Sequence, residues 1–190
     1  MTKKLVFASY LIAVALLVSS GCKTMEQAES KKFVLRVNCA ADEPYTDKVG
    51  NEWLPDQYAK EDLKWGAVYG MTIDRGDLGI TGTDAPKIYE TERYSMDAYE
   101  FTVPDGKYTV RLHFAETFEG IVGSGERVFS VTINDKTVLK DFDVFDAASG
   151  FEKPIVKKFK GVTVTDGKLT VGFIPDIENP EINGIEVLSE

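Results

Sequence analysis

The sequence predicts an all-β fold, an antiparallel β-sandwich of the jelly-roll type. Apolar and polar residues alternate over short segments such as 99–103 and 108–114, which is the pattern of strands buried on one face. Turns rich in Gly, Asp and Asn separate these segments, as in antiparallel sheets that pack face to face. No segment sustains the apolar spacing of three and four residues that an amphipathic helix requires.

The first 22 residues have the pattern of an export signal. Lys3 and Lys4 precede an almost wholly apolar run at residues 5–18, which is shorter than the about 20 apolar residues that span a membrane. Gly21-Cys22 follows this run and resembles the lipobox of bacterial lipoproteins, in which the cysteine is lipidated. We therefore expect residues 1–22 to be a lipoprotein signal peptide with Cys22 as the lipid attachment point. Ordinary secretion is the alternative.

Residues 23–32 (KTMEQAESKK) are polar and have no apolar period, as expected of a tether. The folded domain is then expected at residues 33–189. Together, these assignments predict a protein of the bacterial cell envelope that a lipid attaches to the membrane, in the periplasm or on the cell surface.

The chain carries a formal net charge of −9. An acidic surface disfavours nucleic acids and anionic membrane surfaces as partners. The two cysteines are Cys22 and Cys39. If Cys22 carries lipid, Cys39 has no intramolecular partner, and we expect it to be a small buried hydrophobic residue.

Alternation places the strands along the chain. The turns at 134–135 and 165–168 are expected to close β-hairpins. Residues 40–86 contain scattered prolines and glycines without a sustained period, which predicts a long functional loop region with a few short strands. We expect strands at residues 33–37, 99–103, 108–114, 129–133, 138–144, 159–164, 169–173 and 182–188.

Signatures of catalysis, metal binding and cofactor binding are weak. His113, the one histidine, lies on the polar face of its strand, and no Gly-x-Ser-x-Gly elbow supplies a nucleophile for it. Asp141, Asp143 and Asp146 lack the glycine of a calcium loop, although a structural calcium site elsewhere stays open. We expect no cofactor and no catalytic residue.

Aromatic residues are the stronger indication of function. Tyr69, Tyr94 and Phe118 fall outside the core-facing alternation, at expected loop starts or strand ends. Rings in such positions can stack on the apolar face of a sugar while nearby carboxylates and arginines bind its hydroxyl groups. The alternative is that each ring packs into the core.

Six motifs then place the chain in a known family. Together they resemble, in the family's order, the motif series of malectin and malectin-like domains, and they cover the expected domain from about residue 33 to residue 188. The motifs are RVNCAA at 36–41, VYGM at 68–71, YETERY at 89–94, LHFAE at 112–116, DFDVF at 141–145 and ENPEINGIE at 178–186.

The resemblance implies a galactose-binding-like jelly roll that binds glucose-type oligosaccharides without catalysis, at an aromatic site with an acidic residue from the C-terminal loop. Phe118 stands where animal malectin has tyrosine, and Glu119 where it has phenylalanine. Glu178 stands where it has aspartate, with Asp176 close by. The carbohydrate-binding residues expected from the resemblance and from their neighbours are Tyr69, Glu92, Arg93, Tyr94, Phe118, Glu119, Asp176 and Glu178.

The sequence therefore predicts a non-catalytic, membrane-attached, lectin-like module that binds an oligosaccharide or polysaccharide. Bacterial malectin-like domains are often attached to polysaccharide-degrading enzymes, so association with such enzymes is expected. Two alternatives stay open. One is a surface adaptor that binds a protein or cell-wall partner with the same fold. The other is a small glycosidase, which would need two carboxylates facing each other across a cleft.

Overall fold

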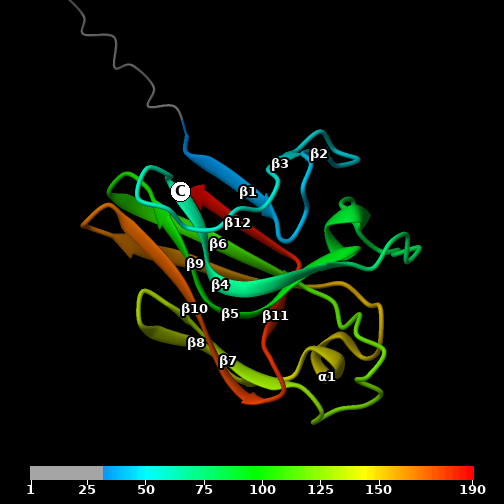
Figure 1. Ribbon diagram of the computed structural model, residues 1–190. Helices are drawn as coiled ribbons and strands as arrows, with labels where there is room; N and C mark the ends of the chain where they lie inside the picture. The colour runs from blue at the N-terminus through cyan, green and yellow to red at the C-terminus, as the bar shows by residue number, and fades with distance from the viewer. Residues whose placement is uncertain (1–31) are drawn as a thin grey trace, which may run out of the picture. The chain divides into compact units, whose positions relative to one another are not determined.

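The computed structural model describes residues 32–190, so the expected signal peptide, Cys22 and residues 23–31 of the tether lie outside the described residues. The described chain forms two antiparallel β-sheets packed face to face (Figure 1), which confirms the predicted all-β sandwich. Within residues 32–190, no helix is long and apolar enough to cross a membrane.

The smaller sheet of the sandwich has four strands and holds both the first and the last strand. Its order is β1 (Val34–Asn38), β12 (Gly184–Ser189), β6 (Gly106–Phe114) and β9 (Ile155–Val164).

The larger sheet has six strands, and its longest strand, β5, has neighbours on both sides. β4 pairs with β5 along one edge, and β10 and β11 pair with successive parts of the other edge. Its strands are β4 (Trp65–Asp74), β5 (Thr91–Thr102), β11 (Glu181–Ile182), β10 (Lys168–Ile177), β7 (Val128–Ile133) and β8 (Lys136–Phe142).

Three short elements complete the described chain. They are a small hairpin of β2 (Tyr45–Thr46) and β3 (Glu52–Trp53), a 3₁₀ turn η1 (Pro86–Tyr89), and a single helix α1 (Val144–Ala148).

The core lies between the two sheets and follows the predicted alternation. β6 buries Val110, Leu112 and Phe114, while β7 buries Phe129 and Val131. Burial of each large apolar side chain stabilises the fold by about 1.5–3 kcal/mol. The sandwich is therefore held mainly by apolar contacts, and Cys39, buried and unpaired, is one of the residues in this core.

His113 projects from the opposite face of β6, as parity predicts, but it is buried. A second apolar cluster that includes Trp53 and Tyr89 covers this face. The imidazole lies between the Tyr89 hydroxyl, 2.9 Å from Nδ1, and Glu186, 3.0 Å from Nε2. Its neighbours are thus structural partners. The polar face on which the sequence places His113 is buried, because residues of the 40–90 region cover it.

One predicted hairpin is confirmed and one is wrong. Asn134 and Asp135 have φ of 47° and 62° and join the paired strands β7 and β8, as a tight hairpin turn requires. The turn at 165–168 does not close a hairpin, because β9 pairs with β6 while β10 pairs with β5 and β7. This turn carries the chain from one sheet to the other.

Two further boundaries differ from expectation. The region 40–86 contains β4, a full ten-residue strand. It lacks alternation because it carries Gly66 and Gly70 and a bulge at residues 68–69. The strand expected at 138–144 ends at Phe142, since the Asp143 carboxylate accepts a hydrogen bond from the backbone N–H of Asp146 and starts α1.

Candidate carbohydrate-binding site

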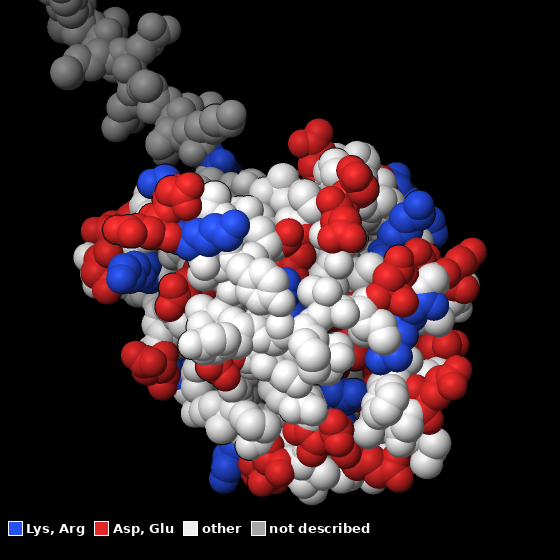
Figure 2. Space-filling view, viewed as in Figure 1, with Lys and Arg blue, Asp and Glu red and all other residues white. Residues whose placement is uncertain are grey.

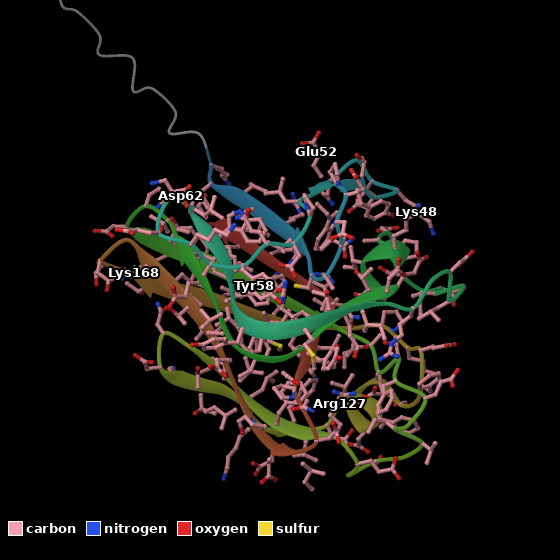
Figure 3. The ribbon with its side chains drawn as sticks, in the orientation of Figure 1. Lys48, Glu52, Tyr58, Asp62, Arg127 and Lys168 are labelled. Atoms are coloured by element: carbon pink, nitrogen blue, oxygen red, sulfur yellow. The ribbon has the colours of Figure 1, made fainter. Side chains whose placement is uncertain are left out.

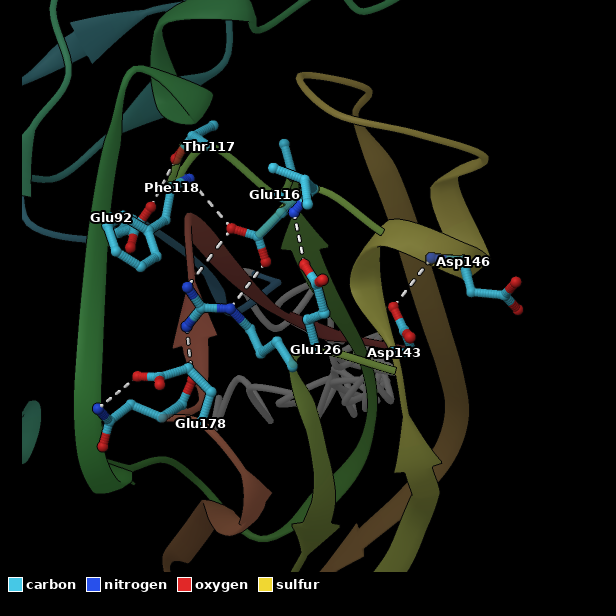
Figure 4. A network of polar contacts seen from close by, with 12 residues as sticks. Glu92, Glu116, Thr117, Phe118, Glu126, Asp143, Asp146 and Glu178 are labelled. Carbon is cyan, nitrogen blue, oxygen red and sulfur yellow. Dashed lines mark hydrogen bonds and ion pairs between the residues drawn. The ribbon is translucent and has the colours of Figure 1, made fainter. Parts of the chain in front are cut away.

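A pocket of about 190 Å³ opens beside the end of β4 and the start of β5. Two loops form its other walls: one follows β6 and leads to β7, and the other joins β10 to β11 (Figure 4). The residues that line it are Ile73, Arg75, Glu92, Tyr94, Phe118, Arg127, Glu178 and Asn179.

Strand pairing sets which side chains face the pocket. Ile73 lies opposite Glu92, and Met71 lies opposite Tyr94, in the antiparallel pair of β4 and β5. On the other edge of β5, Glu181 lies opposite Tyr94. Residues directly opposite each other in antiparallel strands project to the same face, so all five side chains share the face on which the pocket opens.

Two aromatic rings stand at the pocket. Phe118 is 40% exposed, and the guanidinium carbon of Arg75 lies 5.5 Å from its ring centroid, within the range of a cation–π contact. Tyr94 is half-buried, and its hydroxyl contacts the sulfur of Met71 at 3.8 Å. These rings offer apolar surface beside polar groups, which is the chemistry that a sugar ring needs.

A buried ion pair forms one wall. Arg127 donates from Nε to Glu116 Oε2 at 2.7 Å, and its Nη1 donates to the carbonyl of Asn179. Glu116 is fully buried and also accepts the backbone N–H of Phe118 at 3.0 Å. Burial raises the pKa of Glu116 although Arg127 opposes this shift. Arg127 thereby links the Phe118 loop to the loop that carries Glu178.

A second ion pair forms the floor. Glu92 is 1% exposed, and its Oε1 lies 3.2 Å from Arg75 Nη2. The other carboxylate oxygen accepts a hydrogen bond from the Thr117 hydroxyl. Both carboxylate oxygens of Glu92 are therefore occupied, and the group orients Arg75 toward the pocket.

Glu178 is the free carboxylate at the rim. It is exposed, it has a left-handed backbone with φ of 57°, and its Oε1 accepts a hydrogen bond from the Asn179 amide at 3.0 Å. The described residues offer its second oxygen no donor within hydrogen-bond distance. This oxygen is an acceptor that a ligand hydroxyl can reach.

The expected carbohydrate-binding residues divide into two sets. The structure brings Glu92, Tyr94, Phe118 and Glu178 together around the pocket. It leaves the other four outside the pocket lining: Tyr69, Arg93, Glu119 and Asp176.

The four residues outside the lining differ in their surroundings. Tyr69 lies on β4 and is 71% exposed, so its ring faces solvent beside the pocket. Glu119 and Asp176 are exposed. Arg93 is 2% exposed and binds Asp56 on the opposite face of β5, because neighbours of Glu92 and Tyr94 along a strand point the other way.

Sequence reasoning missed four pocket residues: Ile73, Arg75, Arg127 and Asn179. Ile73 and Arg75 were hidden by the missed strand β4. Arg127 had a signal in the sequence, because it stands directly before the apolar strand at 128–133. In the structure Arg127 is 3% exposed. Buried arginines are rare unless they are paired, but its partner Glu116 is apparent only from the fold.

The carboxylates of this region do not form a metal centre. Within residues 32–190, no group of three or more His, Cys, Asp or Glu residues has a geometry that could hold a metal ion. Arg75 and Arg127 lie among the carboxylates and balance their charge instead.

Comparison with known proteins identifies the fold family. The family model described as Malectin domain matches residues 33–185. Malectin of Danio rerio is 27% identical over 204 residues, which covers 95% of this chain and 67% of that protein. Malectin-A of Xenopus laevis is 33% identical over 116 residues, or 53% of this chain and 41% of that protein.

Receptor-like kinases of plants match this chain as well. A probable LRR receptor-like serine/threonine-protein kinase of Arabidopsis thaliana is 38% identical over 93 residues, which covers 45% of this chain and 9% of the kinase. This chain therefore covers only 9% of the length of that kinase and 41% of the length of Xenopus Malectin-A.

Solved structures share the fold at lower identity. A Bacteroides uniformis β-glucuronidase superimposes with a TM-score of 0.74 at 24% identity, over 83% of this chain and 18% of the enzyme. The plant protein FER, in complex with peptide RALF23 and LLG2, gives a TM-score of 0.67 at 21% identity, over 83% of this chain and 48% of that chain. The matched range of 33–185 includes the whole pocket, and this chain belongs to the malectin domain family.

Proposed function

We propose that this domain is a non-catalytic carbohydrate-binding module and that the pocket beside Tyr94 and Phe118 receives the sugar. The observation that carries the proposal is the pair of accessible rings above a floor of fixed ion pairs. A sugar ring would stack on Phe118 or Tyr94, while its hydroxyl groups donate to Glu178. The family resemblance favours a glucose-type oligosaccharide.

The size of the pocket favours a short part of a glycan. Its volume of about 190 Å³ is below the ~300–1,000 Å³ of sites that enclose drug-sized ligands. One or two sugar rings would fill it, and the rest of an oligosaccharide or polysaccharide would lie outside, where Tyr69 is exposed.

The charges of the site favour an uncharged sugar. The guanidinium groups of Arg75 and Arg127 are each paired with a carboxylate, while Glu178 is free at the rim. A uronate or sulfate group would meet this negative charge without a spare cation, and like charges brought together weaken binding. Neutral glucans should therefore bind better than polyuronates.

The same pairing argues against the glycosidase alternative. Glu92 and Glu116 have both carboxylate oxygens occupied by partners within the protein. Glycoside hydrolysis needs two carboxylates that can act on the substrate from opposite sides. Glu178 alone meets that description at the pocket, and binding is the function that this arrangement favours.

A glycan array with the 23–190 fragment tests the proposal. We expect neutral glucans among the bound sugars, and we expect Phe118→Ala and Tyr94→Ala each to weaken binding by at least about tenfold, or ~1.4 kcal/mol. Val156→Ala, an exposed apolar change on β9, is the control and should bind as the wild type does. Failure of every polysaccharide, or wild-type affinity in both ring variants, would contradict the proposal.

Tyr69→Ala decides how far the site extends. The family resemblance includes Tyr69 in the sugar platform, whereas its ring stands outside the pocket lining. A loss of affinity for long glucans but not for a disaccharide would mean that Tyr69 contacts sugar rings outside the pocket.

A second candidate function is that of an adaptor for a protein or cell-wall partner. Tyr58, Tyr69 and Met71 are 48%, 71% and 54% exposed, and the Tyr58 hydroxyl donates to the carbonyl of Gly70 between the other two. Figure 2 shows an uncharged surface over β4 and β5, and Figure 3 places Tyr58 beside β4. If Tyr69→Ala and Met71→Ala abolish capture of a protein partner while sugars never bind, the adaptor function holds.

The location of the protein belongs to this proposal too. We propose that residues 1–22 direct export and that a lipid on Cys22 holds the domain at the membrane of a bacterial cell envelope, where it associates with polysaccharide-degrading enzymes. Labelling with a palmitate analogue should mark the wild type and not Cys22→Ala. Unlabelled wild-type protein would refute lipidation.

A further inference from the structure

Beneath the pocket lies a carboxyl group that has no partner. Glu181 is 0% exposed, and within the described residues neither of its side-chain oxygens has a hydrogen-bond partner. It lies opposite Tyr94 in the pairing of β11 with β5, so it projects to the face that bears the pocket. A buried polar group is normally hydrogen-bonded, and an exception calls for an explanation.

Four charged groups act on Glu181, and they come from different parts of the fold. Glu92 is contributed by β5, Glu116 by the loop after β6, Arg127 by the residue before β7, and Arg75 by the loop after β4. The Cys39 thiol and the Tyr89 hydroxyl are also close enough that a negative charge on Glu181 would raise their pKa values.

A count of charges shows an imbalance. There are three carboxyl groups and two guanidinium groups in this cluster. Arg127 is engaged by Glu116, and Arg75 is engaged by Glu92. An ionised Glu181 would be a third negative charge, unpaired and away from water, which is a highly unfavourable state. Burial, together with Glu92 and Glu116, raises the pKa of Glu181 well above its ordinary value.

Arg127 connects this imbalance to the pocket. Its Nε and Nη2 donate to Glu116, and its Nη1 donates to the carbonyl of Asn179, next to the rim residue Glu178. A neutral Glu181 leaves these three bonds undisturbed. An ionised Glu181 would compete for the same guanidinium group and draw it away from Asn179.

We propose that Glu181 is a neutral carboxylic acid in the folded domain and a positioning residue for the pocket, because its proton keeps Arg127 on Glu116 and on the Asn179 carbonyl. The wall formed by residues 178–179 is then intact only while Glu181 holds its proton. As a statement about ligand binding this inference rests on the proposed function, but its test uses no sugar. Absence of glycan binding would therefore refute the function and leave the inference standing.

Infrared difference spectroscopy of the whole chain in detergent tests the protonation state. The wild type at pH 7 should show a carboxylic-acid C=O band that Glu181→Gln lacks and that the exposed control Glu100→Gln retains. A spectrum without such a band at pH 7, or a band that persists in Glu181→Gln, would overturn the proposal.

The pH dependence of folding stability is a second test of whether Glu181 is protonated in the folded domain. A raised pKa in the folded state means that the contribution of Glu181 to stability is complete below its ordinary pKa of 4.5 and is lost as the pH rises above that value. The wild-type unfolding constant should therefore increase relative to that of Glu181→Gln by up to about tenfold per pH unit above this point. Parallel pH profiles for the two proteins would be contrary evidence.

Nuclear magnetic resonance of the wild type tests the positioning role. Because it needs no variant, it also applies if Glu181→Gln does not fold. In the wild type, the backbone amide resonances of Glu178 and Asn179 should shift with the same pH midpoint as the loss of the carboxylic-acid band. If the band titrates and these two resonances stay fixed, Glu181 holds a proton but does not position the pocket wall.

Discussion

Arg93→Met should destabilise the domain more than any change at an exposed charge. Arg93 is 2% exposed and its Nε donates to Asp56 Oδ2 at 2.7 Å and to the Tyr99 hydroxyl at 3.1 Å. Its Nη1 lies 3.3 Å from the carbonyl of Tyr69, and its guanidinium carbon lies 4.4 Å from the Tyr58 ring centroid. Methionine fills a similar volume but removes every one of these donors.

The size of the effect follows from what remains around Asp56. Removing one partner of a buried ion pair costs about 3–5 kcal/mol, because the other charge stays buried. The Asp56 carboxylate keeps hydrogen bonds from Tyr99 and from the backbone N–H of Ala40 and of Gln57. These bonds reduce the penalty, and we expect a loss near the lower end, about 3 kcal/mol. That is a large part of the ~5–15 kcal/mol of a typical domain.

Urea unfolding followed by far-ultraviolet circular dichroism measures this loss. Arg111→Met is the matched control, because Arg111 is 38% exposed in its side chain and its partner Glu186 also pairs with Arg36. It should cost about 1 kcal/mol or less. Combining Arg93→Met with Asp56→Asn should cost less than the sum of the single changes, since the unpaired charge is then removed. A loss below about 1 kcal/mol for Arg93→Met with an unchanged urea slope would refute the reasoning.

Three other changes have definite expected outcomes. Glu186 has a pKa of about 2 against an ordinary 4.5, because its hydrogen bond to His113 and the neighbouring arginines outweigh burial. Its contribution of roughly 3 kcal/mol is present above pH 4.5 and lost as the pH falls toward 2, so Glu186→Gln should flatten the acid side of a stability profile. Gly66→Ala should lower the melting temperature strongly, because its Cβ would lie 2.4 Å from the backbone nitrogen of Ala59. Asp135→Gly should raise stability by up to about 1 kcal/mol in thermal unfolding, because position 135 has a φ of 62° that glycine adopts without strain.

The sequence predicted the fold better than it predicted connections between the sheets. Alternation in β6 and β7 depends on local burial and is visible in the residues themselves. The turn at 165–168 is equally visible, but whether two strands joined by a turn pair with each other depends on the other strands available. β9 finds β6, and β10 finds β5, so a correctly recognised turn led to a wrong hairpin.

The candidate site was predictable in part for a similar reason. Tyr94, Phe118 and Glu178 lie in family motifs, and the fold brings them together. Arg93 lies in the same motif as Tyr94, yet strand parity turns it to the opposite face. Assigning it correctly required knowing that residues 91–96 belong to β5, and neither this start nor β4 was visible as an alternating pattern.

The buried charges explain how a β-sandwich can hold a pocket made of loops. Residues 117–118 and 127 belong to the connection between β6 and β7, whereas residues 178–179 belong to the connection between β10 and β11. Hydrogen bonds between paired strands do not join these two connections. Arg127 joins the two, because Glu116 accepts hydrogen bonds from the Arg127 guanidinium and from the Phe118 N–H, while the Asn179 carbonyl accepts one from Arg127 Nη1. Apolar contacts alone would stabilise such loops without fixing one arrangement, whereas these bonds are directional. The rings and the rim carboxylate are therefore held in place before a ligand arrives, which lowers the entropy lost on binding.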